Sequence, residues 1–219
     1  MTPWDLPTDI KINRLCKIIP PNPKFIICYR NIKNHILSLY KNYLSFGYTE
    51  HFDIFIKEVL LLNNYGFLND LNLYSLKRYF FDNLSEFDLI FTNIENENSL
   101  KRLFAFLGLK LANNDIFLNR SFANNEISSA IDFNKLNSKT SLLDWLECHR
   151  IFNYTGNTDE MFFRMSRKRI SQNNYIEKNS DKLRFSLNSF EWPDEVIKIQ
   201  HNNSEFELSN TGNNINFIN

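Results

Sequence analysis

The sequence lacks an excess of charge of either sign. Its 25 lysines and arginines balance 25 aspartates and glutamates, and the pI is about 6.9. A protein that binds duplex DNA or an anionic membrane through its bulk charge carries a basic surplus. The composition therefore argues against both partners, whereas a local pocket for a small anion is compatible with it.

The chain also lacks long apolar runs and is poor in cysteine. No stretch reaches the 18 apolar residues of a membrane-spanning helix, and no apolar core of signal-peptide length follows Met1. The three cysteines, Cys16, Cys28 and Cys148, are far apart and indicate neither a disulfide framework nor a zinc site. We therefore expect a cytoplasmic protein with no membrane span and no bound metal.

Apolar residues are abundant, at 43% of the chain, and 21 of its residues are Phe. This content is enough to bury a core, so disorder along the whole chain is excluded. The length of 219 residues fits one domain with an extension. We expect a single domain over residues 1–199 and an asparagine-rich, disordered tail over residues 200–219.

Two continuously apolar runs, "KFIICY" at 24–29 and "FDLIF" at 87–91, predict strands covered on both faces. Apolar residues at helical spacing predict helices between and after them. These helices cover residues 9–18, 31–46 and 71–84, a segment capped by Thr49, a segment from Ser99 to Gly108, and residues near 141–152 and 158–170. Strands that alternate with helices indicate an α/β fold with a parallel sheet.

In the first helix we expect Ile10, Leu15 and Ile18 to face the core. Asparagine is common throughout, so sequons of the type Asn-x-Thr arise by chance and carry no weight.

Arg30 stands at the carboxyl end of the first predicted strand, where open α/β sheets bind ligands. Its guanidinium can bind a phosphate through two parallel hydrogen bonds. Ser38, two helical turns further on, can donate a hydroxyl to the same anion. The alternative is that Ser38 lies with Asn34 and Lys41 in a polar stripe on the solvated face of the helix.

This stretch resembles the second nucleotide-binding motif of the sulfotransferases that use 3′-phosphoadenosine 5′-phosphosulfate (PAPS). In that family a strand ends in Arg, Asn and Pro follow, and a Ser lies on the next helix eight residues after the Arg. Here Arg30, Asn31, Ser38 and Tyr40 stand in register, and Ile32 replaces the proline. The resemblance implies that Arg30 and Ser38 bind the 3′-phosphate of the nucleotide.

Further similarity covers most of the chain. "PNPKFIICYRN" is similar to the family's approach to this motif, and the segment from "SLKRYFF" to "LFAFLGL" is similar to the helix, strand and helix that follow. The family's "Y-E-D/N-L" is replaced by "TNIEN", and "LNRSFANNEISSAIDFN" at 118–134 is similar to a segment of many bacterial members. The resemblance implies a three-layer α/β/α fold of the P-loop-NTPase type. It also implies sulfuryl transfer from PAPS to a hydroxyl or amine, with a carbohydrate as the expected acceptor.

The phosphate loop of that family, "P-K-S/C-G-T-T", has no counterpart here, because none of the five glycines lies in such a loop. "MTPWDLP" instead resembles the segment after that loop in carbohydrate-type members. The resemblance therefore implies a partial fold that begins after its first strand. The alternative function is that of a truncated, catalytically inactive member, which acts only as a weak nucleotide-binding or interaction module.

No catalytic residue is assigned. The chain has four histidines, His35, His51, His149 and His201, and nothing in the sequence marks one of them as a general base. Cys148 and His149 are neighbours on a predicted helix, so they point in different directions and form no nucleophile–base pair. A basic cluster at 164–169 is similar to the cationic C-terminal phosphate loop of cytosolic members but lacks its glycines and Trp. The interpretation we favour is that these cations lie where the dipole of a predicted helix stabilises them.

Overall fold

In the computed structural model, the described residues are 8–20, 22–45, 47–61, 67–84, 87–109, 122–137, 172–178 and 190–211. The chain divides into two compact units. The helical unit comprises Met1–Asp5, Ile36–Leu61 and Leu118–Glu191, and the sheet unit comprises Leu6–His35, Leu62–Phe117 and Trp192–Asn219.

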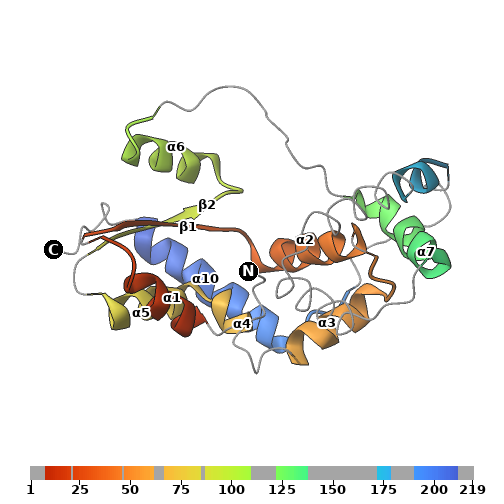
Figure 1. Cartoon of the computed structure of the whole chain (residues 1–219), viewed down its shortest axis with the longest axis horizontal. Coiled ribbons are helices and arrows are strands. Elements are labelled where there is room, and N and C mark those ends of the chain that lie inside the picture. Colours follow the sequence, from red (N-terminus) through yellow and green to blue (C-terminus); the bar gives the residue numbers. More distant parts are fainter. Residues whose placement is uncertain are drawn as a thin grey trace. The chain divides into compact units, whose positions relative to one another are not determined.

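The sheet unit contains a small parallel sheet and several helices (Figure 1). Its elements are α1 (Thr8–Cys16), β1 (Lys24–Tyr29), the start of α2 (Ile32–Ser45), α4 (Phe67–Asp70), α5 (Leu73–Asn83), β2 (Asp88–Asn93), α6 (Glu97–Phe106) and α10 (Asp194–Thr211). β1 and β2 pair in parallel, in a register that runs from Lys24 opposite Asp88 to Tyr29 opposite Asn93. Both predicted strands are confirmed, and so is the mixed α/β class.

Aromatic residues attach one face of the sheet to α5 and α10 (Figure 1). The centroid of the Phe25 ring in β1 lies 4.6 Å from that of Phe80 in α5, and Phe91 in β2 lies 4.9 Å from Phe206 in α10. Such ring pairs stabilise a core by about 0.5–1.5 kcal/mol each, beyond the effect of burial. α6 lies on the other face, where it packs on β2.

The prediction of strands covered on both faces is wrong for β1. Its side chains alternate between half-buried and exposed, and Lys24, Ile26 and Cys28 are the exposed ones. The reason is that α6 packs on β2, so the same face of β1 stays accessible and Ile26 is 39% exposed. A continuous apolar run therefore does not by itself show that two layers cover a strand.

The first helix is confirmed, but the prediction of which of its residues face the core is wrong. Ile10, Leu15 and Ile18 are all exposed, and Ile12 is the buried apolar residue of α1. Ile10 and Ile12 lie on opposite sides of a helix, because two residues correspond to about 200° of rotation. Ile18 lies beyond the last helical residue, Cys16, so helical spacing does not govern where it points.

Asparagine caps two of the helices in the sheet unit. The Asn72 side chain accepts hydrogen bonds from two backbone N–H groups in the first turn of α5, and Asn96 does the same for α6. Asn96, and not the predicted Ser99, is therefore the cap of α6. The helix stops as predicted, because Gly108 adopts the left-handed conformation, with φ of +67°.

The helical unit is built around two buried tyrosines. Its described elements are the rest of α2, α3 (Phe52–Leu61), the 3-10 turn η2 (Asn124–Glu126), α7 (Ile127–Asn137) and a helical segment at residues 172–178. Tyr40, Tyr48 and Phe55 are fully buried, and their rings pack against one another in edge-to-face and tilted contacts. The prediction that Thr49 caps the helix after residue 46 is wrong, because that helix, α3, begins only at Phe52.

Two buried amides satisfy backbone carbonyls where α2 ends. Asn134 donates to the carbonyls of Leu44 and Tyr48 at 2.8 and 2.7 Å. Gln172 donates to the Leu44 carbonyl at 3.0 Å and to Asn134 Oδ1 at 2.9 Å. The last carbonyls of a helix have no partner within the helix, so these amides allow this end of α2 to be buried.

The expectation of a disordered tail is wrong for residues 200–211, which form the second part of α10. Asn203 and Phe206 are both buried there. Asn203 accepts a hydrogen bond from the Leu73 N–H at 3.0 Å and donates to the Leu71 carbonyl at 2.8 Å. This asparagine-rich segment is ordered because the Asn203 amide forms hydrogen bonds with the backbone at the start of α5.

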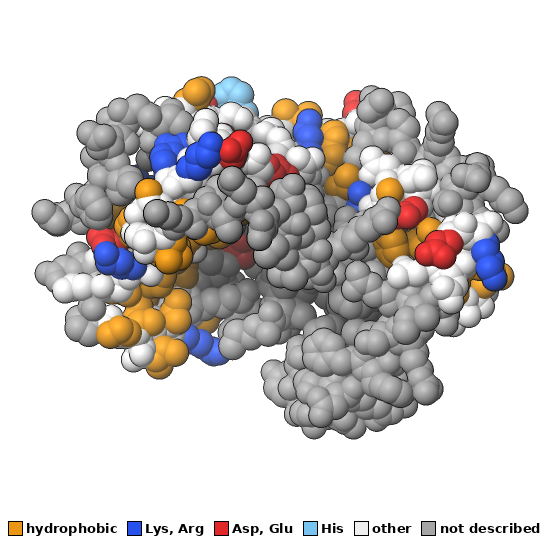
Figure 2. Space-filling model, turned by 90° about the horizontal axis from the view of Figure 1, so that it is seen from above, with side chains coloured by type: hydrophobic (Ala, Val, Ile, Leu, Met, Phe, Trp, Pro, Cys, Tyr) orange, Lys and Arg blue, Asp and Glu red, His pale blue; other side chains and the backbone are white. Residues whose placement is uncertain are grey.

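Among the described residues, no helix is long and apolar enough to cross a membrane. On the face drawn in Figure 2, basic and acidic side chains are interspersed, in keeping with the neutral net charge. The helices predicted near 141–152 and 158–170 lie outside the described residues.

Candidate functional site

The candidate site lies at the carboxyl edge of the sheet, within the sheet unit. Because Tyr29 of β1 stands opposite Asn93 of β2, the segments that follow the two strands leave the sheet side by side. The Ile94 N–H donates to the Tyr29 carbonyl at 2.9 Å, which extends the pairing by one residue. This is the edge at which open α/β sheets bind ligands.

Arg30 follows β1 directly and is half-buried at this edge, as predicted. None of the described residues forms an ion pair with its guanidinium within 4 Å. A guanidinium carries five N–H donors in a planar fork, and an anionic ligand can accept from two of them at once.

The N-terminus of α2 is next to Arg30, and a carboxylate of the chain itself binds there. Glu95 Oε2 accepts a hydrogen bond from the Asn31 N–H at 3.0 Å. Asn34 Nδ2 donates to Oε1 and Oε2 of Glu95 at 3.1 and 3.3 Å. Asn31 caps α2 in turn, because its Oδ1 accepts from the Lys33 N–H at 2.9 Å. The negative charge of Glu95 is favourable at the positive end of the helix dipole.

His35 lies one turn into α2 and is half-buried. Burial lowers its pKa below the usual value, and the positive charge of Arg30 lowers it further, while Glu95 acts in the opposite direction. The imidazole is therefore neutral near pH 7. Its electrostatic coupling to Arg30 and Glu95 shows that the three side chains belong to one local cluster.

Ser38, the second predicted site residue, lies in α2 and is half-buried. The boundary between the two units falls within α2, so Arg30 belongs to the sheet unit and Ser38 to the helical unit. That the two side chains bind one phosphate together stays a prediction.

A second polar cluster lies beside the first, on the α10 side of the sheet. The Tyr29 hydroxyl and Asn93 Nδ2 both donate to the carboxylate of Glu207 in α10, the latter at 3.0 Å. Burial and then the charge of Glu207 raise the pKa of Tyr29 well above its usual value, and Arg102 opposes this shift. The phenol therefore stays protonated and fixes α10 to the ends of both strands.

Sequence reasoning missed Glu95 and Glu207. For Glu95 a signal was present, since it lies four residues after the predicted strand at 87–91, which was expected to run parallel to the strand that precedes Arg30. For Glu207 no signal was present, because its segment reads as a polar tail. The other two described histidines are exposed, and in the described part of the chain no three metal-ligating side chains come together. His149, Cys148 and the basic cluster at 164–169 lie outside the described residues.

The chain was compared with protein-family models, with curated proteins and with solved structures, and nothing matches it in any of the three comparisons.

Proposed function

We propose that this chain is a PAPS-dependent sulfotransferase-like protein, which transfers a sulfuryl group to a hydroxyl or amine of a carbohydrate. One observation carries the proposal: Arg30 lies directly after a strand of a parallel pair and directly before a helix N-terminus. Phosphates of nucleotides bind at this place in open α/β sheets. The resemblance of the segment from Pro21 to Tyr40 to the sulfotransferase motif adds the identity of the nucleotide. The same resemblance implies a three-layer α/β/α, P-loop-like fold in which the pair β1–β2 is part of a wider sheet.

In this proposal Arg30 and Ser38 bind the 3′-phosphate of the nucleotide. The oxygen or nitrogen of the acceptor attacks sulfur, the bond from sulfur to the phosphate oxygen breaks, and adenosine 3′,5′-bisphosphate leaves. A base takes the proton of the acceptor, and cationic groups stabilise the charge that develops on the leaving oxygen. Arg30 holds the leaving nucleotide and takes no part in the bond changes.

Glu95 limits which hydrogen-bond donors at this edge of the sheet are available to a phosphate. Its carboxylate already accepts from the Asn31 N–H and from Asn34, so these donors are not available to a ligand while Glu95 is in place. The phosphate then depends on the Arg30 guanidinium. Removal of Arg30 should therefore affect binding more than removal of any other residue at this edge.

A second candidate is an inactive module that binds the nucleotide weakly or serves only in interactions. The observation in its favour is that the sequence contains no glycine-rich phosphate loop, which in the family binds the 5′-phosphosulfate. The two candidates differ in turnover: only the enzyme consumes PAPS in the presence of a carbohydrate acceptor, whereas the inactive module at most binds adenosine 3′,5′-bisphosphate at Arg30.

The decisive experiment is a calorimetric titration of adenosine 3′,5′-bisphosphate into wild type and Arg30→Ala. Loss of a charged hydrogen-bonded pair should weaken binding by about 1.5–3 kcal/mol, which is roughly 10- to 100-fold in Kd. Lys198→Ala removes the same charge from an exposed position on α10 and serves as the matched control. Equal affinity in wild type and Arg30→Ala would rule out the assigned site.

A further inference from the structure

A groove between α1 and α5 lies apart from the sheet edge described above. Its volume is about 660 Å³, which falls within the range of roughly 300–1,000 Å³ typical of small-molecule sites. Both helices belong to the sheet unit and pack on each other. The groove therefore has a defined geometry within that unit.

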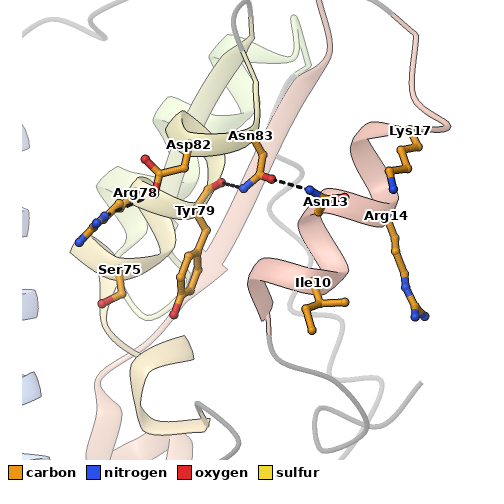
Figure 3. A pocket seen from close by; sticks show the side chains of 9 residues that line it. All are labelled: Ile10, Asn13, Arg14, Lys17, Ser75, Arg78, Tyr79, Asp82 and Asn83. Carbon is orange, nitrogen blue, oxygen red and sulfur yellow. Dashed lines mark hydrogen bonds and ion pairs between the residues drawn. The ribbon is translucent and has the colours of Figure 1, made fainter.

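One face of each helix lines the groove. The lining residues of α1 and of the turn after it are spaced by three or four positions, and the same holds for α5, so each set forms a single face. Between the two helices, Asn13 Nδ2 donates to Asn83 Oδ1 at 3.1 Å, and Asn83 Nδ2 donates to the Tyr79 carbonyl at 2.7 Å. The amide pair connects the two walls (Figure 3).

The charge of the groove differs from that of the chain. Of the described residues that line it, three are cations, Arg14, Lys17 and Arg78, and one is an acid, Asp82. The chain as a whole has no net charge. Asp82 Oδ2 lies 3.4 Å from Arg78 Nε, and both side chains are exposed on α5. Exposed ion pairs of this kind contribute little to stability. The groove between α1 and α5 thus carries an excess of positive charge, although the chain as a whole is neutral.

The cations stand on different sides of the amide pair. Figure 3 shows Arg14 and Lys17 extending from the wall formed by α1 and the turn after it, and Arg78 extending from the edge of the lining face of α5 that lies farther from α1. A single small ion cannot reach all three side chains in this arrangement. A longer ligand that crosses the amide pair can bring one anionic group to each wall.

We propose that the groove between α1 and α5 binds a small molecule that carries two or more phosphate groups. A phosphate group suits the groove better than a carboxylate does. The phosphate carries nearly two negative charges, and arginine binds two of its oxygens at once. The side chains of Asn13 and Tyr79 lie between the two walls and face the middle of such a ligand. This site is separate from Arg30 and stands whether or not Arg30 binds a nucleotide.

The test is a calorimetric titration of linear tripolyphosphate into the full chain, because this probe has several phosphate groups and no base or sugar. Arg14→Ala/Lys17→Ala should weaken binding by at least about tenfold, since two charge-assisted contacts are lost. Lys57→Ala/Lys198→Ala removes the same charge from exposed positions outside the groove and should change Kd by less than about twofold.

Three outcomes would overturn the proposal. The first is a control variant that loses as much affinity as the groove variant, because diffuse charge would then explain binding. The second is loss of tripolyphosphate binding in Arg30→Ala, which would place the probe at the sheet edge. The third is citrate binding as tightly as tripolyphosphate, which would exclude a preference for phosphate. Arg78→Gln tests the opposite wall with a milder change, and far-ultraviolet circular dichroism confirms that each variant keeps its helices.

Discussion

The carboxylate of Glu95 accepts a hydrogen bond from the backbone N–H of Asn31 at 3.0 Å. This contact connects the segment after β2 to the cap of α2, across the carboxyl edge of the sheet. It has two effects. It stabilises the start of α2, and it places a negative charge beside Arg30, where a phosphate is expected.

The first prediction concerns the stability that Glu95 provides. Glu95→Ala should lower the free energy of unfolding by about 0.5–1 kcal/mol, which is below the range for a buried charged hydrogen bond because Glu95 is exposed. Urea unfolding followed by circular dichroism measures the change. Glu97→Ala is the control, because Glu97 is an exposed acid whose ion pair with Lys101 lies within α6. A loss of equal size in both variants would show that the Glu95 contact has no special role.

The second prediction concerns the charge of Glu95 and rests on the proposed nucleotide site. Glu95→Gln keeps an acceptor for the Asn31 N–H but removes the negative charge next to Arg30. Adenosine 3′,5′-bisphosphate should therefore bind a few-fold more tightly, by roughly 1 kcal/mol at low salt. The gain should shrink as salt is added, because screening weakens the repulsion that the substitution removes. Weaker binding to Glu95→Gln would mean that Glu95 supports the site and does not oppose the ligand.

Much of the fold follows from the sequence, but the site does only in part. Apolar runs identified β1 and β2, and the rule for parallel sheets placed Arg30 at their carboxyl edge. Which acid reaches the start of α2 depends on the register of the two strands. The sequence after β2 offers both Glu95 and Glu97, and sequence spacing does not distinguish them. Similarly, Asn96 and Ser99 are both good caps, and only the exact start of α6 selects Asn96.

The burial of polar residues was the least predictable feature. Asn203 lies in a segment with few apolar residues, and it is buried because the start of α5, some 130 residues earlier, needs a partner for the Leu73 N–H. Asn134 and Gln172 are buried for a similar reason at the end of α2. Such contacts depend on tertiary structure, and local patterns of apolar residues carry no information about them.

The third prediction concerns pH. The pKa of His35 is lowered in the folded chain, mainly by burial and then by Arg30, so the unfolded chain binds a proton more readily. Stability should therefore be complete above the unfolded value of about 6.5 and should fall as the pH drops below it. His35→Gln should flatten this decline between about pH 5 and 7, as measured by urea unfolding at several pH values.

His51→Gln is the control for the pH experiment, because His51 is exposed and should leave the decline unchanged. Arg30→Ala should flatten the decline in part, since it removes the second cause of the shift. An identical pH dependence in wild type and His35→Gln would show that other groups govern stability in this range.

The fourth prediction concerns the link between α10 and the strand ends. Tyr29→Phe removes one donor to Glu207 and should cost about 0.5–1.5 kcal/mol of the free energy of unfolding. Glu207→Ala should cost more, because it leaves both the Tyr29 hydroxyl and the Asn93 amide without this acceptor. A double-mutant cycle measures the coupling between Tyr29 and Glu207, which we expect to be at least about 0.5 kcal/mol. Strict additivity would show that the hydroxyl and the carboxylate act independently.

The fifth prediction concerns residues 200–211, which the sequence suggested to be part of a disordered tail. Asn203→Ala removes two hydrogen bonds and leaves the buried Leu73 N–H and the Leu71 carbonyl without this partner. The free energy of unfolding should fall by about 2–3 kcal/mol, the cost of unsatisfied buried groups. Asn202→Ala, on the neighbouring half-buried residue, should cost less than about 0.5 kcal/mol.

A chain that ends at residue 199 also loses Phe206, which packs on Phe91 of β2, so it should fail to unfold cooperatively. A cooperative transition at the wild-type denaturant midpoint in this shortened chain would show that the second part of α10 does not belong to the folded sheet unit.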